Sequence, residues 1–199
     1  MKRVMSIVCL LALGSMFLLS SCFYPEKFQI KINIDKNGDY SFSYDGTLFY
    51  LTEEDDKEKI VLNDKDEQTI KKLEVIMRKD SSFQEIKYLG NSRFKVIYKK
   101  EGRTKEGMAF FQENSIINIE PVALDVVIIK AGPMGKELAD VFKKHNIKLE
   151  GTISVTTNAT VIQHNATTTP PFFGFSGAYG WQIKPDDLPH PVMILKVSQ

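Results

Sequence analysis

The sequence contains few cysteine, tryptophan and histidine residues, and it has no marked excess of charge of either sign. Of its 199 residues, two are cysteine, one is tryptophan and three are histidine, while 26 Lys and Arg side chains nearly balance 25 Asp and Glu. Balanced charge removes the electrostatic case for nucleic-acid binding, which needs a clustered basic face. Both cysteines, Cys9 and Cys22, lie near the N-terminus, so the rest of the chain must fold without disulfides.

A long apolar run occurs only at the N-terminus. Lys2 and Arg3 precede an apolar stretch from Val4 to Leu19. A basic start followed by an apolar stretch of this length is typical of a secretory signal peptide rather than of a membrane-spanning helix. We therefore expect the protein to be exported from the cytoplasm.

The end of this stretch, Leu19-Ser20-Ser21-Cys22, resembles the lipobox of bacterial lipoproteins, in which an aliphatic residue and two small residues precede a cysteine. The resemblance implies that the chain is cut before Cys22, that the Cys22 thiol receives a diacylglyceryl group, and that the new amino group is often acylated as well. Two or three long acyl chains would hold the protein on a membrane almost permanently. The alternative is an ordinary signal peptide that ends in a cysteine by chance.

These patterns divide the chain into a signal peptide (1–21), a lipidated tether (22–27) and a single exported domain (28–199). Removal of residues 1–21 leaves 24 basic and 25 acidic side chains, so the mature chain is close to neutral. A chain of its size buries about two thirds of its unfolded surface. Size therefore permits a stable core without disulfides.

Alternating apolar residues predict an antiparallel sheet. Residues 28–34 and 40–44 are apolar at every second position, and Asn37-Gly38 between them predicts a tight hairpin turn. Gly90-Asn91-Ser92 predicts the turn of a second hairpin. Further strands are expected at 108–112, 116–119, 126–129, within 151–162, and at 179–183 and 192–197.

Two segments have the apolar spacing of helices. The first contains Ile70, Leu73, Ile76 and Met77 and follows acidic residues that can cap its start. The second spans 133–145. Together with the strands, these segments predict an α+β fold, with a curved, mainly antiparallel sheet of about seven to nine strands packed on one or two helices.

The lipobox, the early hairpin, Asn165-Ala166 and the strand that begins Tyr179-Gly180-Trp181 together resemble the LppM-like lipoproteins. The resemblance implies an α+β fold in which a curved antiparallel sheet wraps a helix and leaves an apolar cavity for lipid. The chain departs from this family in its last apolar run, residues 192–197, which is far too short for a C-terminal membrane-spanning segment. This departure is compatible with the fold of the family, but it weakens the inference that the chain binds the same ligand.

The sequence carries no catalytic or metal-binding signature. His145, His164 and His190 are scattered, without the close pairing that metal sites use, and no Gly-x-Ser-x-Gly turn is present to expose a nucleophile. We therefore expect a protein without enzymatic activity, cofactor or bound metal.

Five aromatic residues gather late in the chain, namely Phe172, Phe173, Phe175, Tyr179 and Trp181. Such residues commonly line apolar sites, and the first three have few neighbours in sequence to pack against, because prolines and glycines flank them. The sequence thus predicts a lipid-anchored protein of the bacterial cell envelope whose exported domain binds an apolar ligand such as a lipid. The alternatives are an envelope assembly protein that docks through the 172–175 loop or a sheet edge, and plain core packing of these rings.

Overall fold

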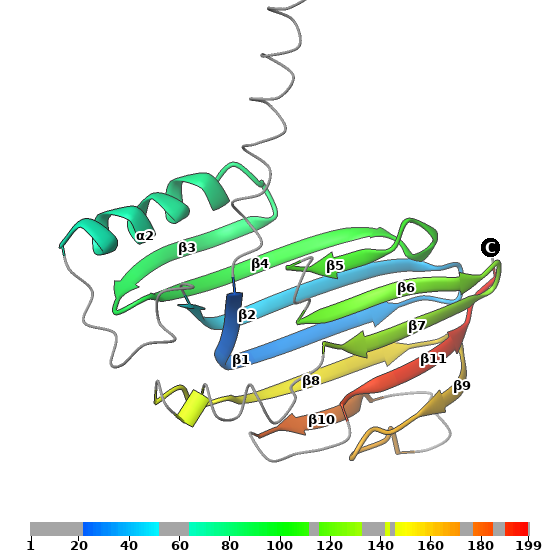
Figure 1. Ribbon diagram of the computed structural model, residues 1–199. Coiled ribbons are helices and arrows are strands. Elements are labelled where there is room, and N and C mark those ends of the chain that lie inside the picture. Colours follow the sequence, from blue (N-terminus) through cyan, green and yellow to red (C-terminus); the bar gives the residue numbers. More distant parts are fainter. Residues whose placement is uncertain are drawn as a thin grey trace, which may run out of the picture.

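The strands of the protein form two stacked sheets in the computed structural model, which describes residues 22–51, 64–111, 116–132, 142–143, 146–171, 177–184 and 190–198 (Figure 1). The six-stranded sheet contains, in spatial order, β10 (Tyr179–Ile183), β8 (Glu150–Thr157), β1 (Cys22–Ile34), β2 (Asp39–Leu51), β4 (Arg93–Arg103) and β3 (Phe83–Gly90). The five-stranded sheet contains β5 (Met108–Phe110), β6 (Ile117–Ala123), β7 (Val126–Ala131), β11 (Val192–Lys196) and β9 (Thr160–His164). Neighbouring strands are antiparallel, except that β1 and β8 are parallel.

The hairpin of β1 and β2 confirms the first predicted turn. The Asp35 carboxylate accepts hydrogen bonds from the backbone N–H groups of Asn37 (2.8 Å) and Asp39 (3.0 Å). Gly38 has φ +80°, a conformation that glycine adopts without a steric penalty. The turn sets the register so that the apolar residues of both strands face the same side, as the alternating pattern predicted.

Strand β1 begins at Cys22, six residues before the strand that the sequence predicts at residues 28–34. Cys22 is opposite Leu51 and Pro25 is opposite Leu48 in the pairing with β2. The register then shifts between Pro25 and Phe28, where Figure 1 shows β1 bending. The bend buries three consecutive residues, 23 to 25, which breaks the alternation that would have revealed a strand.

Gly46 of β2 permits this bend. A Cβ atom at Gly46 would lie 2.5 Å from the backbone oxygen of Lys27 and 2.7 Å from the Cβ of Phe28. Any larger residue at this position would push the two backbones apart, so the close approach of β1 and β2 depends on glycine.

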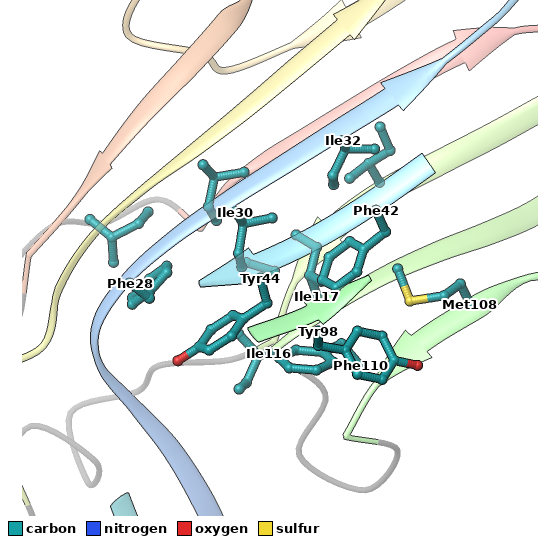
Figure 2. Close-up of a cluster of buried hydrophobic side chains, with 14 of the residues drawn as sticks. Phe28, Ile30, Ile32, Phe42, Tyr44, Tyr98, Met108, Phe110, Ile116 and Ile117 are labelled. Carbon is teal, nitrogen blue, oxygen red and sulfur yellow. The ribbon is translucent and has the colours of Figure 1, made fainter. Parts of the chain in front are cut away.

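The hydrophobic core lies between the two sheets. Figure 2 shows side chains of β1 and β2 pointing toward those of β5 and β6. The ring of Phe110 is central, with centroid distances of 5.3 Å to Phe42, 4.9 Å to Tyr44 and 4.9 Å to Tyr98. Burial of each such side chain contributes about 1.5–3 kcal/mol, so this layer supplies most of the stabilisation of the fold.

The described strands number eleven and form two sheets, whereas the sequence predicted one sheet of seven to nine strands. One cause is the run at 151–162, for which the sequence predicts strand structure but no boundary. A turn at Asn158 divides it into β8 and β9, and the Asn158 side chain accepts a hydrogen bond from the backbone N–H of Lys36 (2.6 Å). The two strands then join different sheets, and alternation alone cannot predict which sheet a strand joins.

Helix α2 (Asp64–Met77) confirms the first predicted helix, and Figure 1 shows it beside β3. Its buried residues include Ile70 and Met77. Glu74 attaches it to β3 by accepting hydrogen bonds from the backbone N–H of Tyr88 (2.9 Å) and from the Arg78 guanidinium (2.8 Å). The short 3-10 helix η3 (Thr104–Glu106) follows β4.

The second predicted helix, 133–145, lies almost entirely outside the described residues, of which 142–143 are helical. No helix in the described ranges has both the length and the apolar character needed to cross a membrane.

Candidate functional site

An apolar cleft of about 370 Å³ lies where the end of α2 meets the starts of β1 and β3 and the short strand β5. Aromatic rings and a methionine form much of its wall: Phe23, Met77, Phe83, Tyr98, Phe110 and Phe111. The volume falls within the range of small-molecule sites, which are mostly apolar and concave.

Phe111 connects the parts of this wall. Its ring centroid lies 4.9 Å from that of Phe23, 4.7 Å from that of Phe110 and 6.4 Å from that of Phe83. Its backbone has φ +61°, which an aromatic residue rarely adopts. Strained backbone of this kind persists only where the surrounding structure imposes it, and it gathers at ligand-binding sites.

Polar groups border the cleft. Asp80 and Lys100 are exposed and contribute to its wall. Burial raises the pKa of Tyr98 further above neutrality, and its uncharged hydroxyl adds a polar group to the wall. The site therefore combines an apolar interior with charged residues, an arrangement that suits a ligand with an apolar part and a polar end.

The cleft adjoins the residue that the sequence predicts to be lipidated. Phe23, which directly follows Cys22, is buried and packs its ring against Tyr50 (5.0 Å) and Phe94 (5.9 Å). Because β1 begins at Cys22, the cleft and the predicted anchor lie within one residue of each other along the strand.

Trp181, one of the predicted contact residues, is buried in the core instead of lining this cleft. Its indole N–H donates to the side-chain oxygen of Asn165 (2.9 Å), which also accepts from the backbone N–H of Val192 (2.8 Å). The Asn165 amide nitrogen donates to the backbone oxygen of His190 (2.7 Å). This network ties β10 of one sheet to β9 and β11 of the other.

Tyr179 is half-buried beside the same network, with its ring 4.8 Å from that of His164. Phe172, Phe173 and Phe175 lie outside the described residues, and so does the side chain of Cys22. The predicted ligand contacts of the three phenylalanines and the predicted lipidation of Cys22 stay predictions.

The cleft residues themselves were missed by the sequence analysis. Phe110-Phe111 ends a short strand with two consecutive large apolar residues, of which an alternating strand can bury only one in its own core. That break in the pattern was the available signal. Phe23 and Phe83 gave no comparable signal, because each lies at the start of its strand, where too few residues precede it to form a pattern.

His164 and His190, the two histidines among the described residues, both take part in hydrogen bonds with the backbone or with Asn165. The imidazole of His164 accepts a hydrogen bond from the backbone N–H of Ala166 (3.1 Å), and the backbone oxygen of His190 is bonded to Asn165. His145 lies outside the described residues. Within the described ranges, no three His, Cys, Asp or Glu side chains are grouped closely enough to hold a metal ion.

Comparisons with known proteins give one structural likeness. No protein-family model matches the chain, and no curated protein matches it either. Among solved structures, the chain is similar to the NMR structure of the folded domain of the Mycobacterium tuberculosis protein LppM, with a TM-score of 0.43 and 10% sequence identity over 88% of this chain and 92% of that one. A likeness at this level assigns neither a family nor a site residue.

Proposed function

We propose that the protein is a membrane-anchored lipoprotein of the bacterial cell envelope, and that its exported domain binds the acyl part of an amphipathic lipid without catalysis. The observation that carries the proposal is the apolar cleft beside the start of β1. The sequence supplies the second element, the lipobox that ends at Cys22.

The position of Cys22 favours a lipid as the ligand. Because β1 begins at this residue, acyl chains on Cys22 would attach directly to folded structure. A strand advances about 3.3 Å per residue, so the cleft wall at Phe23 would lie within a few ångströms of the anchor. A lipid tail from the same membrane would reach the cleft without a long passage through water.

The chemistry of the cleft favours binding over reaction. Burial of a methylene group contributes about 0.8 kcal/mol, so about six of them would contribute about 5 kcal/mol before the entropic cost of binding. The charged side chains of Asp80 and Lys100 suit contact with the polar end of the ligand.

Photo-crosslinking in cells tests the proposal. Bacteria that express the full chain would be fed a diazirine fatty acid, illuminated, and the modified peptides of the purified protein identified by mass spectrometry. We expect cross-links to the peptide that contains Ala109 and Phe111. Ala109→Trp, which places a large side chain at the cleft wall, should reduce this yield at least fivefold.

Ala123→Trp is the matched control, because Ala123 is also an exposed strand residue but does not line the cleft. Equal cross-linking of both variants would contradict the proposal. Cross-links to another envelope protein through the 172–175 loop or a sheet edge, together with a lipid-free cleft, would favour the docking alternative.

The anchor is tested separately by Cys22→Ala. We expect a protein that keeps its signal peptide or leaves the membrane fraction, and a mature mass that lacks acyl groups. Unchanged membrane retention and unchanged mass would show that the lipobox interpretation is wrong.

A further inference from the structure

The outward face of the six-stranded sheet carries a second hollow, of about 600 Å³. It lies across β8, β1, β2 and β4, on the side away from the core. One row of residues that are neighbours in the strand register crosses it: Ser154, Lys31, Ser43 and Lys99. The next row contains Thr156, Asn33, Ser41 and Glu101.

The shape of this hollow follows from the sizes of its side chains. Ser41 and Ser43 are short and half-buried, so they form a floor on β2. Lys31 on one neighbouring strand and Lys99 on the other are long and exposed. Since neighbouring strands lie about 4.8 Å apart, the two lysines flank Ser43 at a backbone separation of about 10 Å.

The middle of the hollow lacks the acidic partner that neighbouring positions have. On one side, Asp45 of β2 pairs with Lys95 of β4, and on the other, Asp39 pairs with Arg103 at 3.3 Å. Between them, β2 presents serine to Lys99. Neither Lys31 nor Lys99 forms an ion pair with any described residue.

The two serine hydroxyls on the floor of the hollow are also available for hydrogen bonds. Neither the Ser41 nor the Ser43 hydroxyl bonds to another described residue, whereas Ser154 donates to the backbone oxygen of Ile30 (3.3 Å). A group bound above Ser43 would therefore meet a free hydroxyl between two ammonium groups.

We propose that this hollow binds a phosphate group. A tetrahedral anion presents several oxygens, which can accept hydrogen bonds from both lysines and the Ser43 hydroxyl together. Glu101 lies in the next row and repels an extended polyanion, so the site suits one compact anionic group. Such a group comes either from a lipid head group or from a soluble phosphate compound.

The residues that carry the proposal differ from those of the apolar cleft, and Lys100 is the one residue that lines both. Successive residues of a strand point to opposite faces, so Lys31, Ser43 and Lys99 lie on the outward face of strands whose other face forms the core. Failure of lipid binding in the cleft would leave this site unaffected.

Equilibrium dialysis of radiolabelled inorganic phosphate against the full chain in neutral maltoside detergent tests the site. We expect saturable binding that salt weakens, and a loss of about tenfold or more in the Lys31→Gln/Lys99→Gln variant. Lys87→Gln/Lys148→Gln removes the same charge from two exposed lysines outside the hollow and should retain the wild-type affinity. Absence of saturable binding, or equal losses in both variants, would overturn the proposal.

Ser43→Asp gives a test that also reports on folding. An aspartate there supplies the missing acidic partner, so we expect it to abolish phosphate binding while the melting temperature stays equal or rises. Retained phosphate binding in this variant would contradict the site. Competition by phosphatidylglycerol but not by glycerol phosphate would assign a lipid head group as the source, and the reverse would assign a soluble compound.

Discussion

Two regions of this domain that contain aromatic residues differ in how fully their side chains fill the available space. Around Trp181, the polar atom of the indole and the neighbouring backbone groups are all bonded through Asn165, and the ring is buried. Around Phe111, phenylalanine rings pack together, yet a cleft of about 370 Å³ remains beside them. Aromatic content alone therefore does not identify a cleft, since the region around Trp181 is filled and hydrogen-bonded while the region around Phe111 leaves open volume.

The largest expected effect concerns the closed region. Trp181→Ala should lower the free energy of unfolding by about 3–5 kcal/mol, because it leaves a cavity between the sheets. Urea denaturation of the full chain, followed by circular dichroism, measures this loss. If the loss were below about 1 kcal/mol, the two regions would not differ as described.

Removal of the polar link should have the next largest effect. Asn165→Ala leaves the indole N–H of Trp181 and the backbone N–H of Val192 without their partner, so we expect a loss of about 2–3 kcal/mol. Asn158→Ala is the control, because Asn158 is exposed and accepts one hydrogen bond. Similar losses in both variants would argue against a special role for Asn165.

In the open region, backbone strain should be measurable. Phe111→Gly should be more stable than Phe111→Ala by about 1 kcal/mol, because alanine at φ +61° keeps the unfavourable conformation. Both variants should lose lipid cross-linking. Equal stabilities would mean that residue 111 is not strained in solution.

The smallest expected effect concerns the attachment of α2 beside the cleft. The backbone N–H of Tyr88, and then Arg78, lower the pKa of Glu74 below its ordinary value. A lowered pKa in the folded state stabilises the protein above the unfolded pKa, and this contribution disappears as pH falls through the folded value. Glu74→Gln should therefore cost less than about 1 kcal/mol at neutral pH and nothing in acid.

Denaturation of the wild type and of Glu74→Gln at neutral and acidic pH measures this difference. A difference that stays constant as the pH falls would indicate a loss of packing and not a loss of charge. The pH dependence thus tests whether a charged group attaches α2, in contrast to the uncharged network around Trp181.

The sequence predicted the parts of the fold that depend on local pattern. Alternation placed Ile30, Ile32, Phe42 and Tyr44 on the core side, and the turn at Gly38 was predicted from its sequence. These features follow from neighbours a few residues apart, so a single chain is sufficient to reveal them.

Features that depend on distant parts of the chain were not predicted. The strand at 22–27 needs Gly46 to approach it, and the assignment of β9 to the second sheet depends on its pairing with β11. The cleft arises where α2, β3 and β5 meet. No local pattern in Phe23 or Phe83 shows that these segments come together.

The parallel pairing of β1 and β8 has a consequence for how the domain is made. The paired residues, from Lys27 with Glu150 to Ile34 with Thr157, are about 120 residues apart in the chain. Contacts at such separation form slowly, because a long loop must close first. Strand β1 is synthesised early but can pair with β8 only after residues 150–157 have been made. The six-stranded sheet therefore cannot form completely until most of the chain has been synthesised. A chain that folds this late spends longer without its native pairings, and its apolar strands stay exposed to other chains for that time.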